Sequence, residues 1–334
     1  MPREATRAMS RLCIVTLGVL WALAAASPVV GADKTLRVGI LSSGTVEIRG
    51  DLEQSLLQGL RDQGYVEGKN LLIERRYASS MMESMSEAAR ELADMKLDAI
   101  VTTCSPSTRE AKQATSSTPI VMVAVSDPVG QKIIASLAKP GLNVTGLSSQ
   151  AEDLLPKRLE LLSEVISPST TIAVLANASN PVHVRGWQIV ESAAQKTKFK
   201  LMRVDVRTGG DLPAAIQAAA RAQAGALFVL PDDPLLYNSR ASIVEMAGRH
   251  RMPDFHWASE YVEAGGLMSY GENLQRSYRS AAAYIDKLSK GARPSDLPVA
   301  QPTQFELVVN MRRASALGIK IPQSIILRAD RIID

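Results

Sequence analysis

The chain has 334 residues, of which 22% are charged and 46% hydrophobic, and its formal net charge is +4. Charges of both signs are scattered without a basic run or an acidic tail, which argues against nucleic acid as a partner. With two cysteines, the chain does not belong to the disulfide-rich class and must be stabilised by its hydrophobic cores.

The first 32 residues have the layout of a secretory signal peptide. Three arginines precede an apolar run from Leu12 to about Ala26, and Val30-Gly31-Ala32 ends it with residues suited to signal peptidase, so we expect cleavage after Ala32. The run is shorter than the about 20 residues that a membrane span needs, which disfavours the alternative of a retained anchor. Cleavage would leave 302 residues with a net charge of +2 and one cysteine, Cys104. That length suits two domains.

The chain after the signal segment alternates short apolar runs with amphipathic stretches. Strands are predicted at residues 36–41, 71–77, 99–102 and 120–125, and helices at 52–63, 85–95 and 109–115. Strands that are apolar on both faces and alternate with helices indicate a parallel sheet covered on both sides. The turn cluster PGLN at 140–143 closes this first series.

The same alternation then restarts. Helices are predicted at 154–166, 184–197, 212–222 and 240–250, and strands at 171–175, 200–206, 226–230, 254–256 and 266–269. We therefore predict an α/β fold with two doubly wound parallel-sheet lobes. Ligands bind at the carboxyl ends of the strands in such sheets, so the cleft between the lobes is the expected binding site. The fold alone does not settle the function.

The residues that usually carry catalysis or bind metals are not arranged for either task. His183, His250 and His256 lack the spacing of metal ligands, so we predict no metal and no cofactor. The segment GYVEGK at 64–69 precedes a strand and has the wrong spacing for a phosphate loop, which makes it a helix-to-strand turn. Cys104 has no histidine nearby in sequence to act as a base and is interpreted as a loop thiol. We predict that the protein is not an enzyme.

Small polar side chains follow the predicted strands, at Ser43, Ser105, Thr108, Asp127, Asn177, Asn180 and Asp232. Helix capping is the alternative role at each position, but their joint placement at strand ends indicates ligand binding. We predict that Ser105 and Thr108, with Ser43 as a third donor, hold a carboxylate at a helix start. Asp232, or else Asp127, is predicted to pair with an amino group of the ligand.

Aromatic residues make up 4% of the chain, yet four of them fall between Phe255 and Tyr270. We predict that Trp257 and Tyr270 wall the cleft, where they would offer flat apolar surface to a ring. A position in the core is the alternative for each of them.

Seven segments, in matching order, resemble a known family: 59–78 (GLRDQGYVEGKNLLIERRYA), 119–130, 136–148, 157–166, 263–274, 284–310 and 316–330. The family is the ABC-transporter substrate-binding family of the tryptophan/tyrosine transport type. The resemblance implies a type I periplasmic-binding fold with three crossovers, in which residues 33–146 and 275–292 form lobe one and residues 147–271 and 300–334 form lobe two.

The resemblance also implies a function. We expect a monomeric periplasmic component of an importer, which captures a small organic solute and delivers it to an ABC permease at the inner membrane. An aromatic amino acid or a related carboxylate is the expected solute. Family members usually carry glycine where this chain has Cys104, so the family label does not fix the solute. A periplasmic sensory receptor that passes closure to a signalling partner is the alternative function.

Overall fold

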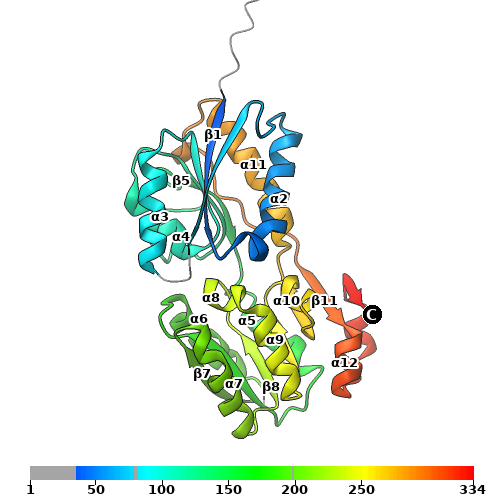
Figure 1. The fold of residues 1–334 in the computed structure, drawn as a ribbon. Helices are drawn as coiled ribbons and strands as arrows, with labels where there is room; N and C mark the ends of the chain where they lie inside the picture. Colours follow the sequence, from blue (N-terminus) through cyan, green and yellow to red (C-terminus); the bar gives the residue numbers. More distant parts are fainter. Residues whose placement is uncertain (1–34, 79–81, 198) are drawn as a thin grey trace, which may run out of the picture. The chain divides into compact units, whose positions relative to one another are not determined.

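The computed structural model describes residues 35–78, 82–197 and 199–334, and the predicted signal peptide at 1–32 lies outside the described residues. Residues 36–334 form one compact unit that contains two α/β lobes (Figure 1). In the described parts of the chain, no helix is both long enough and apolar enough to cross a membrane.

Lobe one is built on a parallel sheet whose described strands follow the order β2-β1-β3-β4-β5. Helices α11 and α2 pack together beside this sheet, and α3 and α4 pack together on its other side (Figure 1). Its elements are β1 (Leu36–Ser43), α2 (Val46–Asp62), β2 (Leu71–Ala78), α3 (Met82–Asp94), β3 (Ala99–Thr102), α4 (Ser105–Ala114), β4 (Ile120–Ser126), β5 (Val144–Ser149), α11 (Leu274–Ser289) and the 3₁₀ turn η2 (Pro294–Asp296).

Lobe two is built on a second sheet with the order β12-β11-β10-β9-β8-β6-β7, in which β11 runs antiparallel to β10. Its elements are α5 (Leu155–Ser163), β6 (Thr171–Asn177), α6 (Val182–Ala194), β7 (Lys200–Val206), η1 (Gly209–Asp211), α7 (Leu212–Arg221), β8 (Ala226–Val229), α8 (Pro234–Asn238), α9 (Arg240–Arg249), β9 (Asp254–His256), α10 (Ser259–Glu263), β10 (Met268–Gly271), β11 (Glu306–Asn310), α12 (Met311–Leu317), α13 (Gln323–Ile326) and β12 (Arg331–Ile333).

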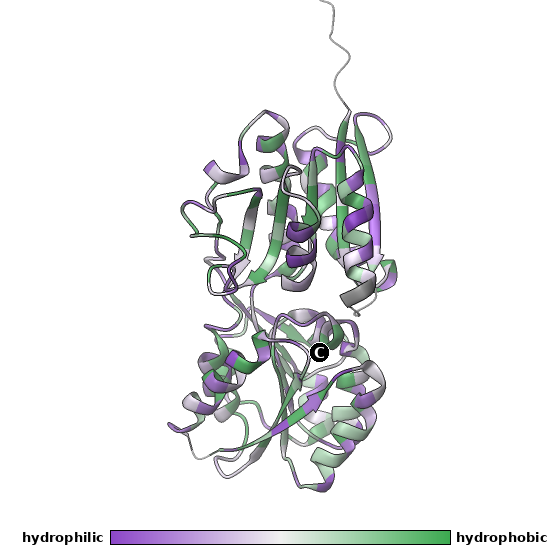
Figure 2. Ribbon diagram, turned by 90° about the vertical axis from the view of Figure 1, so that its left-hand side faces the viewer, coloured by the Kyte–Doolittle hydropathy of each residue, from purple (hydrophilic) through white to green (hydrophobic). Residues whose placement is uncertain are grey.

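The central strands of both sheets are apolar on both faces, as expected for parallel strands covered by helices. Every residue of β3 and of β8 is buried, and neighbouring side chains of each strand enter different core clusters. Figure 2 shows hydrophobic strands inside both lobes and hydrophilic residues on the outer helix surfaces. This arrangement confirms the predicted fold class of two doubly wound lobes.

Within the described residues, the chain passes between the lobes three times, after β5, after β10 and between α11 and β11. The third passage runs beside β5, because the Ala300 N–H donates to the Gly146 carbonyl at 3.0 Å and the Ala300 carbonyl accepts from the Ser148 N–H at 2.9 Å. The sequence places the lobe boundary after residue 146, which falls inside β5. Because β5 pairs with β4 as far as Ser149, this part of lobe one extends to Ser149.

Candidate ligand-binding site

A small cavity of about 20 Å³ lies between the two lobes. Its walls come from both lobes and are formed by Arg49, Thr103, Cys104, Ala124, Leu274 and Tyr278 of lobe one, and by Asp232, Asp233, Pro234, Tyr237 and Trp257 of lobe two. This volume accommodates about one water molecule, so a larger solute requires the lobes or their side chains to move apart.

Two of the six described non-glycine residues with positive φ angles line this cavity. Ala124 and Asp232 both line it with positive φ angles, 56° and 57°, which residues other than glycine rarely adopt. At Ala124, the register between β4 and β5 shifts between Met122 and Val125, which marks an irregularity in the ladder. Strained residues of this kind cluster at ligand sites, because the surrounding structure must hold them in place for a purpose other than stability.

Asp232 connects the lobes directly. Its carboxyl accepts hydrogen bonds from the N–H groups of Ser105 at 3.3 Å and Ser126 at 3.2 Å, and from the Ser105 hydroxyl. All three donors belong to lobe one. Burial raises the pKa of Asp232 to about 6, because the loss of water outweighs the donors that favour its charged form.

The loop that carries Asp232 is held by a set of polar side chains from lobe two. Asp233 accepts from the Leu236 N–H at 2.8 Å, which caps α8, and from the amides of Asn177 and Asn180 at 2.9 Å each. Asn180 also donates to the Asp232 carbonyl at 2.9 Å. The two asparagines predicted as ligand contacts therefore hold the Asp232 loop and do not line the cavity.

Arg49, in the first turns of α2, is a site residue that the sequence analysis missed. Its Nε donates to the Ser43 carbonyl and its terminal nitrogen to the Ser43 hydroxyl, both at 3.0 Å. The guanidinium lies 4.1 Å from the centre of the Tyr237 ring. Ser43 was predicted to donate a hydrogen bond to the ligand carboxylate. It instead accepts from Arg49 and positions its guanidinium. The sequence did carry a signal for this residue. Arg49 follows a strand end closely and lies in the first turn of a helix, where acidic residues are normally favoured.

Several buried polar atoms face this region without a hydrogen bond of good geometry to the rest of the described chain. They are Trp257 Nε1, Tyr278 OH and Thr103 Oγ1. The Trp257 and Tyr237 rings pack at a centroid distance of 5.8 Å. A buried donor without a partner costs about 1–3 kcal/mol, so a ligand or water in the cavity that accepts from these atoms would remove that cost.

Other predicted site residues have different surroundings. The Thr108 hydroxyl lies 2.8 Å from both Thr102 Oγ1 and the Cys104 carbonyl, within lobe one. Tyr270 packs against Phe305, at a centroid distance of 6.1 Å, and does not line the cavity.

Asp127 lies at the rim of the lobe interface, where it forms an ion pair with Arg185 of α6. Cys104 does line the cavity, and its thiol is buried, which raises its pKa. Among the described residues, no group of three or more histidine, cysteine or acidic side chains could hold a metal ion.

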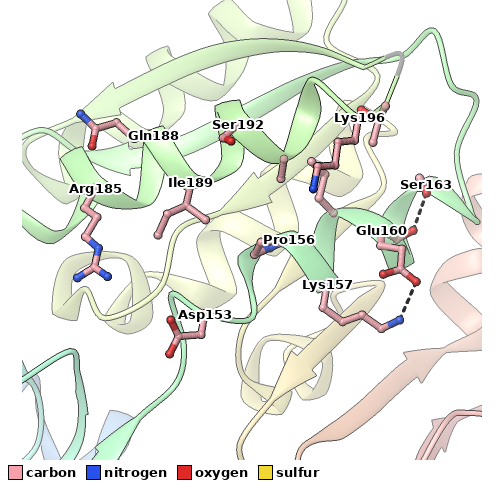
Figure 3. Close-up of a pocket in the computed structure, with 13 residues that line it drawn as sticks. Asp153, Pro156, Lys157, Glu160, Ser163, Arg185, Gln188, Ile189, Ser192 and Lys196 are labelled. Carbon is pink, nitrogen blue, oxygen red and sulfur yellow. Dashed lines mark hydrogen bonds and ion pairs between the residues drawn. The ribbon is translucent and has the colours of Figure 1, made fainter.

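A larger groove of about 960 Å³ lies on lobe two alone, between α5 and α6. Figure 3 shows Lys157 and Glu160 on α5, joined by an ion pair of 2.7 Å, and Gln188 and Ser192 on α6. None of the unpartnered buried polar atoms of the described chain lines this groove. The small interlobe cavity therefore has the chemistry of a ligand site, although the groove is larger.

Comparisons with known proteins agree with this architecture. A family model described as "ABC transporter substrate binding protein" matches residues 47–333. A curated tyrosine-binding protein of Clostridioides difficile is 26% identical over 80% of this chain and 76% of its own length.

Two solved structures cover 90% of this chain and all of their own, each with a TM-score of 0.83. One is a conserved domain protein of Vibrio cholerae with 29% identity. The other is an ABC domain in complex with L-Trp from Streptococcus pneumonia, with 23% identity, which supports the fold alone.

Proposed function

The chain belongs to the ABC transporter substrate-binding protein family, and we propose that it captures a small organic solute between its lobes and delivers it to the membrane permease of an importer. The bridge from Asp232 to Ser105 and Ser126 is the observation that carries this proposal. It joins the lobes at the cavity itself, so lobe separation would open the site and lobe closure would enclose a solute.

The proposed solute is an aromatic amino acid or a related aromatic carboxylate. The tyrosine-binding relative supports this class. The cavity walls support it as well, since Tyr237, Trp257 and Tyr278 offer aromatic surface from both lobes. Each contact with an aromatic ring contributes about 0.5–1.5 kcal/mol beyond simple burial.

We also propose that the protein works in the periplasm as a monomer, after removal of residues 1–32. This family binds solutes and is not a family of enzymes, and we propose no catalytic step and no cofactor. The alternative of a sensory receptor would use the same closure but a different membrane partner.

The proposal is tested by adding L-tyrosine or L-tryptophan to the chain that starts at Asp33. Binding should stabilise the closed state because only that state contacts the solute from both lobes. The radius of gyration in solution scattering should fall, and the tryptophan fluorescence should change. Trp257 lines the cavity, whereas Trp187 lies on α6 near Arg203, so Trp257→Phe should abolish the fluorescence change and Trp187→Phe should preserve it.

Binding without compaction would contradict the closure mechanism. A fluorescence response that persists in Trp257→Phe would leave closure intact and remove this tryptophan from the site. If neither amino acid binds, the proposed solute class is wrong.

A further inference from the structure

Arg49 is a buried charge at the interlobe cavity without an opposite charge beside it. Its side chain is 5% exposed, and its contacts are the two oxygens of Ser43 and the ring of Tyr237. No ion pair within 4 Å joins Arg49 to a carboxylate of the described chain, although Glu260 attracts it from a greater distance. A guanidinium stays charged at any relevant pH, and a buried charge without a partner is unfavourable.

A second cation, Arg240, adds positive charge beside the Tyr237 ring. Arg240 of lobe two lies 4.7 Å from the centre of the same Tyr237 ring and donates to the Ile48 carbonyl of α2 at 3.3 Å. Two guanidinium groups from different lobes therefore meet at one aromatic ring. The start of α2 adds the positive end of its helix dipole, because Arg49 lies at the close of the first helical turn.

The acidic residues of the cavity are engaged by protein donors. Asp232 accepts from Ser105 and Ser126, and Asp233 accepts from the Leu236 N–H and from two asparagine amides. Neither carboxyl depends on a cationic ligand for its hydrogen bonds. Arg49 is the charged group of the cavity walls that gains most from an opposite charge.

We propose that Arg49 binds the carboxylate of the solute and makes the site selective for aromatic carboxylates over aromatic amines. This inference rests on the proposed function and names its recognition chemistry. The solute ring would pack against Tyr237, Trp257 and Tyr278, and Trp257 Nε1 would donate to a solute oxygen. An amino group on the solute is then not required for binding, in contrast to a site centred on Asp232.

Three probes with the same phenol ring separate the contribution of the solute carboxylate from that of the amino group. L-Tyrosine carries both charges, 3-(4-hydroxyphenyl)propionate carries the carboxylate alone, and tyramine carries the amine alone. Titration calorimetry should show that the wild-type protein binds the first two with similar affinity and tyramine about 100-fold more weakly, because loss of one partner leaves a buried charge unpaired. Arg49→Gln should weaken binding of both carboxylates about 100-fold or more. The carboxylate affinity of Arg49→Lys should lie between those of the wild type and Arg49→Gln, since lysine keeps the charge but loses the planar, forked guanidinium.

Arg61→Gln is the matched control, because Arg61 lies on the same helix but is exposed and contacts Gln58. It should bind all probes as the wild type does. The melting temperature of Arg49→Gln without solute should equal or exceed that of the wild type. Equal binding of tyramine and L-tyrosine, or unchanged carboxylate binding in Arg49→Gln, would overturn the inference while the proposed function stands. A wild-type protein that binds none of the three probes and no L-tryptophan would overturn the inference together with the proposed solute class.

Discussion

The carboxyl of Asp232 receives its hydrogen bonds from the opposite lobe, so a change there should act on lobe closure more than on folding. Asp232→Asn replaces one acceptor oxygen with an amide that faces the Ser126 N–H or the Ser105 groups. When two hydrogen-bond donors face each other, a buried polar group is left without a partner, which costs about 1–3 kcal/mol. We expect the radius of gyration of the solute-free protein to rise and solute affinity to fall by about 5- to 100-fold.

Ser105→Ala provides the graded comparison for this prediction. It removes the hydroxyl donor to Asp232 but keeps the Ser105 N–H, so its effect on affinity should be smaller. Its melting temperature should stay close to that of the wild type, because the Ser105 hydroxyl bonds Asp232 and Gln131 and does not cap α4. If Asp232→Asn binds solute as the wild type does and shows no expansion, Asp232 has no role in closure.

The sequence could predict single site residues where a strand end is followed by an unusual polar or aromatic residue. Asp232 was identified in this way and Trp257 from the cluster of aromatic residues between Phe255 and Tyr270, and both line the cavity. Arg49, Tyr237 and Tyr278 were missed because they lie in helices, one or two turns after the strand ends, where their spacing is typical of core or surface positions. Whether such a residue faces a cleft depends on how the lobes meet, and local sequence patterns do not encode that.

Helices α2 and α11 are far apart in sequence but pack closely in lobe one, and Gly59 permits this contact. A Cβ atom at Gly59 would lie 2.3 Å from the Arg279 carbonyl oxygen, which belongs to the backbone of α11 and cannot rotate away. Overpacking of this kind typically costs about 1–3 kcal/mol. Gly59→Ala should therefore lower the free energy of unfolding by about that amount, as measured by urea denaturation.

Gly50→Ala on the same helix is the control for this prediction. A Cβ atom at Gly50 would have no heavy atom within 4 Å outside its own helix backbone and chain neighbours. Alanine is favoured over glycine in a helix by about 0.5–1 kcal/mol, so this variant should be more stable than the wild type. Equal stability of the two variants would mean that α11 shifts to accommodate the new methyl group.

Several strands with a continuous apolar run were predicted from the sequence, although β11, with the sequence ELVVN, was not. The strand β7 has the predicted bounds, and β8 ends one residue earlier than predicted. The strand β5, with the sequence VTGLSS, was missed because glycine and hydroxyl residues interrupt its apolar pattern. Its Gly146, at φ 125°, lies where a Cβ would meet the Met122 carbonyl at 2.2 Å, so close contact with β4 explains the glycine.

Four buried carboxyl groups link the stability of the whole molecule to pH. Burial raises the pKa of Asp232 to about 6 and the pKa values of Glu152, Glu260 and Glu272 to about 7. In the unfolded chain these groups titrate near 4, so between pH 4 and pH 7 the folded protein holds more protons than the unfolded chain. Their contribution is fully present below about pH 4 and is lost as the pH rises through 6 to 7.

His183 has the opposite effect on the pH dependence of stability. Burial lowers its pKa, so its contribution to stability is lost as the pH falls below about 6.5, the ordinary value for histidine. Because four carboxyls oppose one imidazole, the carboxyls should determine the sign. We expect the melting temperature to be higher at pH 5.5 than at pH 8, by about 3 °C or more. The measurement is differential scanning calorimetry at constant ionic strength.

The contribution of a single carboxyl can be isolated at Glu272, which accepts a hydrogen bond from the Ser277 hydroxyl at 2.6 Å. A glutamine keeps this acceptor but does not titrate, so Glu272→Gln should raise the melting temperature at pH 8 more than at pH 5.5 and reduce the difference between them. Glu47→Gln is the control, because Glu47 is exposed and its pKa is lowered by its hydrogen bond to Thr45, so its titration ends below this pH range. A wild-type melting temperature that is highest at pH 8 would show that the buried carboxyls stay ionised in the folded protein. The protein would then close around a fixed negative charge at Asp232, and an amine-bearing solute would gain the partner that the proposed carboxylate recognition does not require.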